Sequence, residues 1–154
     1  TRGQRTQGVI DALEEAGLEV DYMEISAEVD KDASNGIPVI TGYLQSNPDC
    51  DLVVTDHGNL TSSLRTYLES AGFGPDEIHG AGFDLSAATA EGIESGYIDL
   101  VLDQQPFLQG FLPIFQIYLS EKWNFSGLHI DTGAGLIHSG NIDVIAPLAK
   151  EGIR

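Results

Sequence analysis

The chain has 154 residues, of which 42% are hydrophobic, and its formal net charge at pH 7 is −17. This length suits one hydrophobic core and is too short for two ordinary domains, and the composition excludes an intrinsically disordered chain. The excess of acids argues against a nucleic-acid-binding surface, and no run of about 18 apolar residues is present to span a membrane. With Cys50 as its only cysteine, the chain forms no internal disulfide.

The acidic residues, 24 against 7 basic ones, are spread along the chain rather than gathered in one run. A patch for a cationic partner would cluster them, whereas a salt-adapted protein spreads carboxylates over its whole surface. We therefore favour a halophilic protein that molar salt stabilises.

The first predicted elements are a helix and a strand. A helix near residues 4–16 has an inner face at helical spacing, and Gly17 ends it. That face holds Val9, Ile10, Leu13 and Ala16. Leu18–Ile25 is then predicted as a strand with alternating apolar positions.

A second helix is predicted to open at Ile37-Pro38, because proline is tolerated in a first turn, with Asn35 as its cap. It ends at Asn47-Pro48-Asp49. Its inner face is expected to hold Ile37, Ile40, Leu44 and Val39. Leu52–Val54 is a fully apolar strand, the kind that is buried on both faces of a parallel sheet.

The alternation then continues with two more helices and two more strands. These are a helix over Leu60–Ala71, a strand over Ile78–Phe83, a helix that Ser86 caps and Gly96 ends, and a strand over Ile98–Leu102. Strands and helices that alternate with short loops predict an α/β fold, in which helices on both faces cover a parallel sheet.

The pattern changes at Pro106, which can start a helix with a broad apolar face. That face holds Phe107, Leu108, Phe111, Leu112, Phe115, Tyr118 and Leu119. Pro113 should kink this helix or shift its start. The glycine-rich residues 127–135 contain a strand-like segment, His129–Asp131, and Asn141 should cap a closing helix that Pro147 interrupts.

Polar side chains follow the predicted strands at the points where they end. Asp56 follows Leu52–Thr55, Asp84 follows Phe83, and Asp103-Gln104-Gln105 follows Leu102. The carboxyl ends of parallel strands meet at one edge of the sheet, where open α/β folds bind small molecules. The sequence therefore predicts a ligand site at this edge.

Five segments together resemble the sugar-binding proteins of ABC importers, the ribose-binding-protein-like type I periplasmic binding proteins. They are Arg5-Thr6-Gln7-Gly8, Leu44 to Asp49, Gly82 to Ser86, Gly96-Tyr97-Ile98-Asp99 and Asp103-Gln104-Gln105-Pro106. The resemblance implies two α/β lobes joined by three hinge strands, with the sugar in the cleft between them. Residues 1–104 resemble the second lobe, 105–127 a hinge crossing and a helix that packs on the first lobe, and 128–154 the last hinge strand and a closing helix.

Relative to that family, the first lobe and the first strand of the second lobe are expected to be absent from this chain. The sheet would then lack a central strand, and the face led by Phe107, Phe111 and Phe115 would lack its partner. An exposed apolar face of this kind marks an interface, so we expect the first lobe or a second copy of the chain to cover it.

The resemblance also implies four sugar-binding residues, Arg5, Asp56, Asp84 and Gln104. Arg5 has an alternative as a solvated residue of the helix N-terminus, and Asp56 as the cap of the next helix, a role that can coexist with ligand binding. Asp103 or Gln105 is expected to hold the hinge, or to take the ligand in place of Gln104.

The expected function is therefore an extracytoplasmic substrate-binding component that passes a simple sugar or polyol to a membrane permease. We expect no catalysis, no cofactor and no metal. Two alternatives stay open: the sugar-sensing domain of a LacI-type transcription regulator, which shares the fold, and a hydrolase that uses Asp56 and His57.

Overall fold

One sheet organises the part of the chain that the computed structural model describes, residues 2–133 and 135–154. Its strand order is β1-β2-β3-β4, and the first three strands are parallel while β4 runs antiparallel to β3. The bounds are β1 Leu52–Val54, β2 His79–Phe83, β3 Leu100–Asp103 and β4 Gly135–His138. The predicted α/β class is confirmed, with β4 as an antiparallel addition to the parallel strands.

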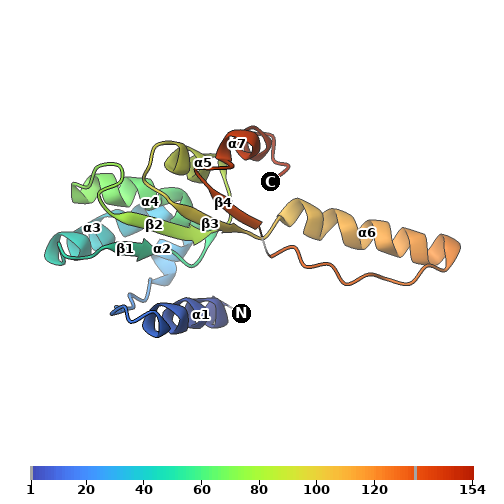
Figure 1. Ribbon diagram of the computed structural model, residues 1–154, viewed down its shortest axis with the longest axis horizontal. Coiled ribbons are helices and arrows are strands. Elements are labelled where there is room, and N and C mark those ends of the chain that lie inside the picture. The colour runs from blue at the N-terminus through green and yellow to red at the C-terminus, as the bar shows by residue number, and fades with distance from the viewer. Residues whose placement is uncertain (1, 134) are drawn as a thin grey trace.

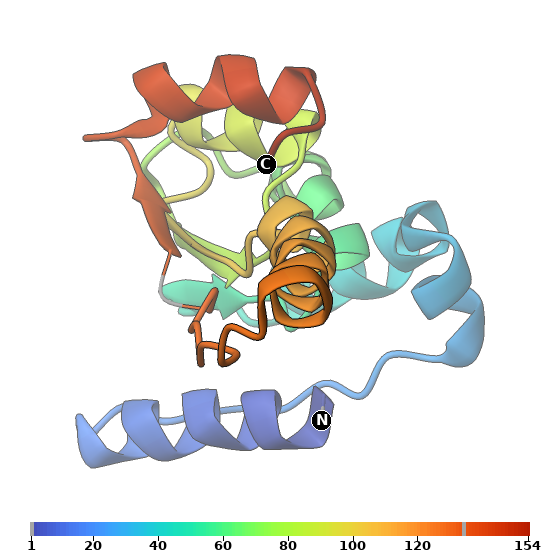
Figure 2. The ribbon, with the colours of Figure 1, turned by 90° about the vertical axis from the view of Figure 1, so that its right-hand side faces the viewer.

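One face of the sheet carries the hydrophobic core. The helices that cover it are α3 (Ile37–Ser46), α4 (Gly58–Ala71), α5 (Ala87–Glu94) and α7 (Ile142–Lys150). They pack in series, α3 on α4, α4 on α5 and α5 on α7, and Figure 2 shows α5 and α7 above the sheet and α1 below it. The large apolar side chains buried most deeply include Leu64, Tyr67, Leu68, Val101 and Ile137.

Helix ends on this face follow the predicted signals. The Ser86 hydroxyl accepts a hydrogen bond from the Thr89 backbone N–H at 3.1 Å, so it caps α5 as expected. Gly96 follows α5 with φ +79°, a left-handed conformation that glycine adopts without strain. Local signals of this kind need no tertiary partner.

Among the described elements, α1 (Arg2–Glu15) alone lies on the other side of the sheet, apart from the remaining elements (Figure 1). A cavity of about 380 Å³ separates the two, and Val9 and Leu13 line it opposite the strands. Helices thus lie on both sides of the sheet as predicted, but none of the four apolar residues expected on the inner face of α1 is buried.

The strand predicted over Leu18–Ile25 is wrong, because residues 18–26 run as irregular backbone. Leu18 and Tyr22 remain 54% and 59% exposed. A strand needs a hydrogen-bonding neighbour, and among the described residues no strand lies between this segment and β1, the edge of the sheet. The segment leads instead into α2 (Ala27–Lys31) and a short 3₁₀ turn, Ala33–Gly36.

Four smaller predictions are also wrong. Asn35 lies inside the 3₁₀ turn and does not cap α3, which Gly36 precedes, and Val39 is 54% exposed rather than on the inner face. His129–Asp131 is not a strand, since pairing with β3 begins at Gly135. Asn141 stands at the start of α7, but its side chain accepts from the His138 N–H instead of capping the helix.

Prolines interrupt neither of the two helices in which they lie. Helix α6 (Pro106–Trp123) runs through Pro113, and α7 runs through Pro147. A proline has no N–H, so the carbonyl four residues before it loses its helical hydrogen bond. Both prolines are exposed, and water can bind that carbonyl instead. The predicted interruption at Pro147 is therefore wrong.

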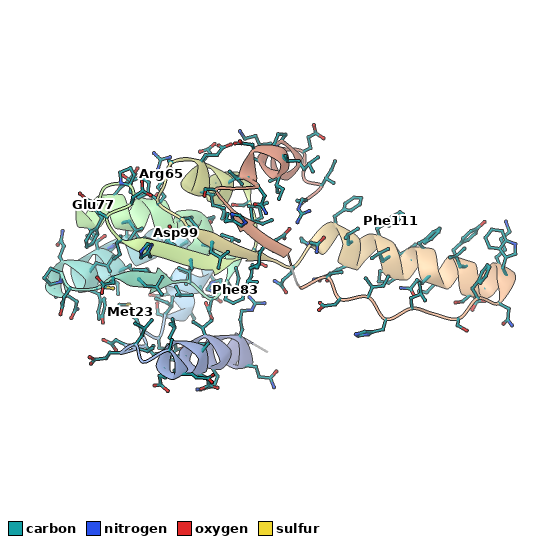
Figure 3. The ribbon with its side chains drawn as sticks, in the orientation of Figure 1. Met23, Arg65, Glu77, Phe83, Asp99 and Phe111 are labelled. Atoms are coloured by element: carbon teal, nitrogen blue, oxygen red, sulfur yellow. The ribbon has the colours of Figure 1, made fainter. Side chains whose placement is uncertain are left out.

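Helix α6 projects away from the sheet, and residues 124–133 return alongside it (Figure 1). No residue of α6 is buried. Phe107, Phe111 and Phe115 stack on one another with ring centroids 6.1 and 5.9 Å apart, and Figure 3 shows Phe111 pointing out from the helix. No helix within the described residues is both long and apolar enough to cross a membrane.

Candidate ligand-binding site

Three strand ends bring the predicted polar residues to one edge of the sheet. Asp56 follows β1, Asp84 follows β2 and Gln104 follows β3, and the three strands are parallel. All three side chains are half-buried, as is that of Arg5, so they remain accessible from solvent while being held by neighbours.

A buried threonine pair fixes the strand ends that carry these residues. The Thr61 hydroxyl donates to the His57 carbonyl at 3.0 Å, accepts from the Phe83 N–H at 3.2 Å and lies 2.8 Å from the Thr55 hydroxyl. A Cβ at Gly82 would lie only 2.5 Å from the Thr55 hydroxyl, so glycine is required there. These contacts join the ends of β1 and β2 to the first turn of α4.

Asp84 and Gln104 lie together, as the sequence predicts. The Gln104 side-chain amide donates a hydrogen bond to Asp84 Oδ1. Asp84 has a left-handed backbone, φ +69°, a conformation that aspartate tolerates better than most residues. Its side chain lies against Gly58, the first residue of α4, where the helix dipole favours a negative charge.

Arg5 reaches the same edge from α1. Its Nη1 donates to the Asp56 carbonyl at 2.8 Å, and its guanidinium carbon lies 4.6 Å from the centroid of the Phe83 ring. Figure 3 shows Phe83 on the side of the sheet that faces α1. Stacked and hydrogen-bonded in this way, Arg5 is a residue of the edge rather than an ordinary solvated residue of a helix N-terminus.

The Asp56 carboxylate contacts two side chains. Its Oδ1 lies 2.5 Å from His57 Nδ1, and its Oδ2 accepts from the Thr6 hydroxyl at 3.3 Å. The cap position of α4 belongs to His57, whose side chain makes no capping bond. Asp56 is therefore not the cap of α4, and its carboxylate faces the edge.

Asp103 and Gln105 hold the chain crossing instead of facing this edge. Asp103 is fully buried, and its Oδ2 accepts from Arg154 Nε and Nη2 at 3.2 and 2.9 Å. The Gln105 side-chain amide donates to the Thr132 carbonyl at 3.0 Å. The sequence carries no signal for the Arg154 contact, because 51 residues separate the partners.

Other chemistry receives little support from the described residues. Burial raises the pKa of the Cys50 thiol, which keeps it in its less reactive protonated form. Within residues 2–133 and 135–154, no group of three or more His, Cys, Asp or Glu side chains is arranged to hold a metal ion.

The comparisons with known proteins agree with this architecture. The family model described as "Periplasmic binding protein domain" matches residues 1–119. A curated relative, the xylose/arabinose-binding protein XylF of Sulfolobus acidocaldarius, is 33% identical over 140 residues, which are 86% of this chain and 34% of that protein. This chain thus spans about a third of the length of that relative.

Solved structures share the fold at lower identity. A carbohydrate-transporter solute-binding protein from Agrobacterium radiobacter, in complex with D-arabinose, matches with a TM-score of 0.77 and 23% identity over 99% of this chain and 50% of that one. A periplasmic ribose ABC transporter protein from Conexibacter woesei matches with a TM-score of 0.76 and 17% identity, over 92% and 47%. The chain belongs to the family of periplasmic binding protein domains.

Proposed function

We propose that this chain forms one lobe of the substrate-binding component of an ABC importer, which captures a simple sugar or small polyol. The observation that carries the proposal is the convergence of Arg5, Asp56, Asp84 and Gln104 at the carboxyl edge of one sheet. The relatives named above are proteins for xylose, arabinose and ribose, which supports a pentose as the ligand class.

These four side chains suit the hydroxyl groups of a sugar. A carboxylate accepts hydrogen bonds from two neighbouring hydroxyls, the amide of Gln104 both donates and accepts, and the fork of Arg5 donates to hydroxyl oxygens. In the structure Gln104 pairs with Asp84, and Arg5 pairs with the Asp56 carbonyl. These contacts hold the donors and acceptors at the edge, where sugar hydroxyls can pair with them.

The uncovered face of α6 supports a second lobe. In this proposal residues 1–104 form one lobe, residues 105–127 cross to the other lobe and pack on it, and residues 128–154 return. The first lobe would cover Phe107, Phe111 and Phe115; in its absence a second copy of the chain would do so. Closure of the lobes would exclude water from the sugar, and the closed protein would meet a permease outside the cytoplasm.

The geometry does not favour the hydrolase that uses Asp56 and His57. Both ring nitrogens of His57 face carboxylates, Nδ1 that of Asp56 and Nε2 that of Asp30. A general base needs a nitrogen within reach of the nucleophile, and here each nitrogen faces an acid instead.

A thermal-shift screen tests the proposal. The complete protein that contains this lobe is heated with xylose, arabinose, ribose and myo-inositol, with lactose as a larger control sugar. At a sugar concentration about 100-fold above the dissociation constant, binding adds about 2.7 kcal/mol of stability, and the melting temperature rises. The 154-residue chain alone supplies half of the contacts and should show little or no shift. A flat response of the complete protein to every sugar would overturn the proposal.

A further inference from the structure

His57 is buried at an edge that otherwise consists of half-buried polar groups. It connects β1 to α4, and only 7% of its surface is exposed. Its backbone is extended, with φ −159°, and its side chain makes no capping hydrogen bond to α4. A buried imidazole in such a place needs polar partners of its own, because water does not reach it.

Two carboxylates from different elements flank the ring. Nδ1 lies 2.5 Å from Oδ1 of Asp56, at the end of β1, and Nε2 lies 2.9 Å from Oδ1 of Asp30, in α2. The Nδ1 contact is a hydrogen bond, whereas the Nε2 contact is close but not aligned as one. α2 is tied to the same corner by the Asn59 amide, which donates to the Asp30 carbonyl at 3.3 Å.

The contact to Nδ1 restrains the side chain of Asp56. Its second oxygen accepts a longer hydrogen bond from Thr6, at 3.3 Å, and the residue as a whole is half-buried. A half-buried carboxylate without the imidazole would rotate between orientations, and ordering it again on binding would lower the affinity for a ligand. We propose that His57 is a positioning residue of the sugar site, which holds the Asp56 carboxylate toward a sugar hydroxyl through Nδ1; this inference rests on the proposed function.

Two amide substitutions separate the roles of the two ring nitrogens. The side-chain nitrogen of asparagine lies near the place of a histidine Nδ1, and that of glutamine near the place of Nε2. His57→Asn therefore keeps a donor for Asp56, His57→Gln keeps one for Asp30, and His57→Phe fills the space without a donor. All three remove the imidazole, so a purely structural role would affect them alike.

The test is the affinity of the complete protein for xylose and arabinose, measured by calorimetry beside the melting temperature without sugar. We expect His57→Asn to bind within about threefold of the wild type, and His57→Gln and His57→Phe to bind about tenfold more weakly, the value of one charge-assisted hydrogen bond. The matched control is His79→Asn: His79 lies 3.2 Å from Asp99, but at the other end of β2, and should leave the affinity unchanged.

The outcomes separate this inference from the function on which it rests. If the wild type binds no sugar, the proposed function fails, and this inference with it. If the wild type binds and His57→Phe binds equally well, only the role of His57 is refuted. An equal loss of sugar affinity in His57→Asn and His57→Gln would also refute it, because keeping a donor at the Nδ1 position would then make no difference to binding.

Discussion

At the scale of single residues, Gly58 lies close against the side chain of Asp84 at the candidate site. A Cβ at Gly58 would lie 3.1 Å from the Cβ of Asp84 and 3.3 Å from its Oδ2. The Gln104 amide already holds Oδ1 of Asp84, so moving the side chain aside would break this hydrogen bond. The absence of a side chain at Gly58 therefore sets where the Asp84 carboxylate lies.

We expect Gly58→Ala to weaken sugar binding about tenfold, because a displaced carboxylate loses about one charge-assisted hydrogen bond to the sugar. Alanine favours a helix over glycine by up to about 1 kcal/mol, so the melting temperature should fall little. Gly42→Ala, in α3, is the matched control, since no atom lies within 4 Å of its added Cβ. Equal sugar affinities in the two variants would contradict this account of Asp84.

The candidate site was predictable to the extent that it follows strand ends. Asp84 and Gln104 directly follow apolar strands, and the structure joins their side chains. Asp30 and Arg154 were not predictable, because each meets its partner only through the tertiary fold: Asp30 reaches His57 from α2, and Arg154 reaches Asp103 across 51 residues.

At the scale of elements, the ends of helix α5 were predicted correctly from local signals, whereas one strand prediction was wrong because it depended on a tertiary neighbour. Ser86 caps α5 and Gly96 follows its end as predicted, because both signals act within a few residues. Leu18–Ile25 has the apolar alternation of a strand but no strand beside it in the described chain, so its pattern does not become a strand. The apolar pattern indicates which side chains favour burial, but a strand also needs a second strand to pair with by hydrogen bonds.

Thr61 is the residue on which the junction of β1, β2 and α4 depends most. Thr61→Val keeps the shape of the side chain but removes the hydroxyl that contacts Thr55, His57 and Phe83. We expect the free energy of unfolding to fall by about 1–3 kcal/mol, because buried polar partners are left unsatisfied. Urea unfolding measures this, with the exposed Thr66→Val of the same helix as control. If both variants have the same midpoint, the hydroxyl network does not hold the junction.

At the scale of the whole molecule, charge dominates. The formal net charge of −17 comes from 24 acidic and 7 basic residues, so the acids outnumber the basic residues that could pair with them. Arg65 pairs with Glu69 and Arg154 with Asp103. Repulsion among the remaining carboxylates opposes the compact state.

Salt should therefore stabilise the protein. The screening length falls from about 10 Å at about 0.1 M salt to about 3 Å at about 1 M, so repulsion between surface carboxylates weakens over this range. We expect the melting temperature to rise through a series of potassium chloride concentrations up to the molar range. An unchanged or falling melting temperature would contradict adaptation to high salt.

The measurement that tests the central claim most directly is a calorimetric titration of the complete protein with xylose or arabinose, compared with its Asp84→Ala variant. Asp84 meets Gln104 at the sheet edge, so its loss removes a carboxylate that we expect to accept from two sugar hydroxyls. We predict saturable binding by the wild type and an affinity about 100-fold lower in the variant. Equal affinity in the two proteins, or no binding to the wild type, would contradict a sugar site at this edge.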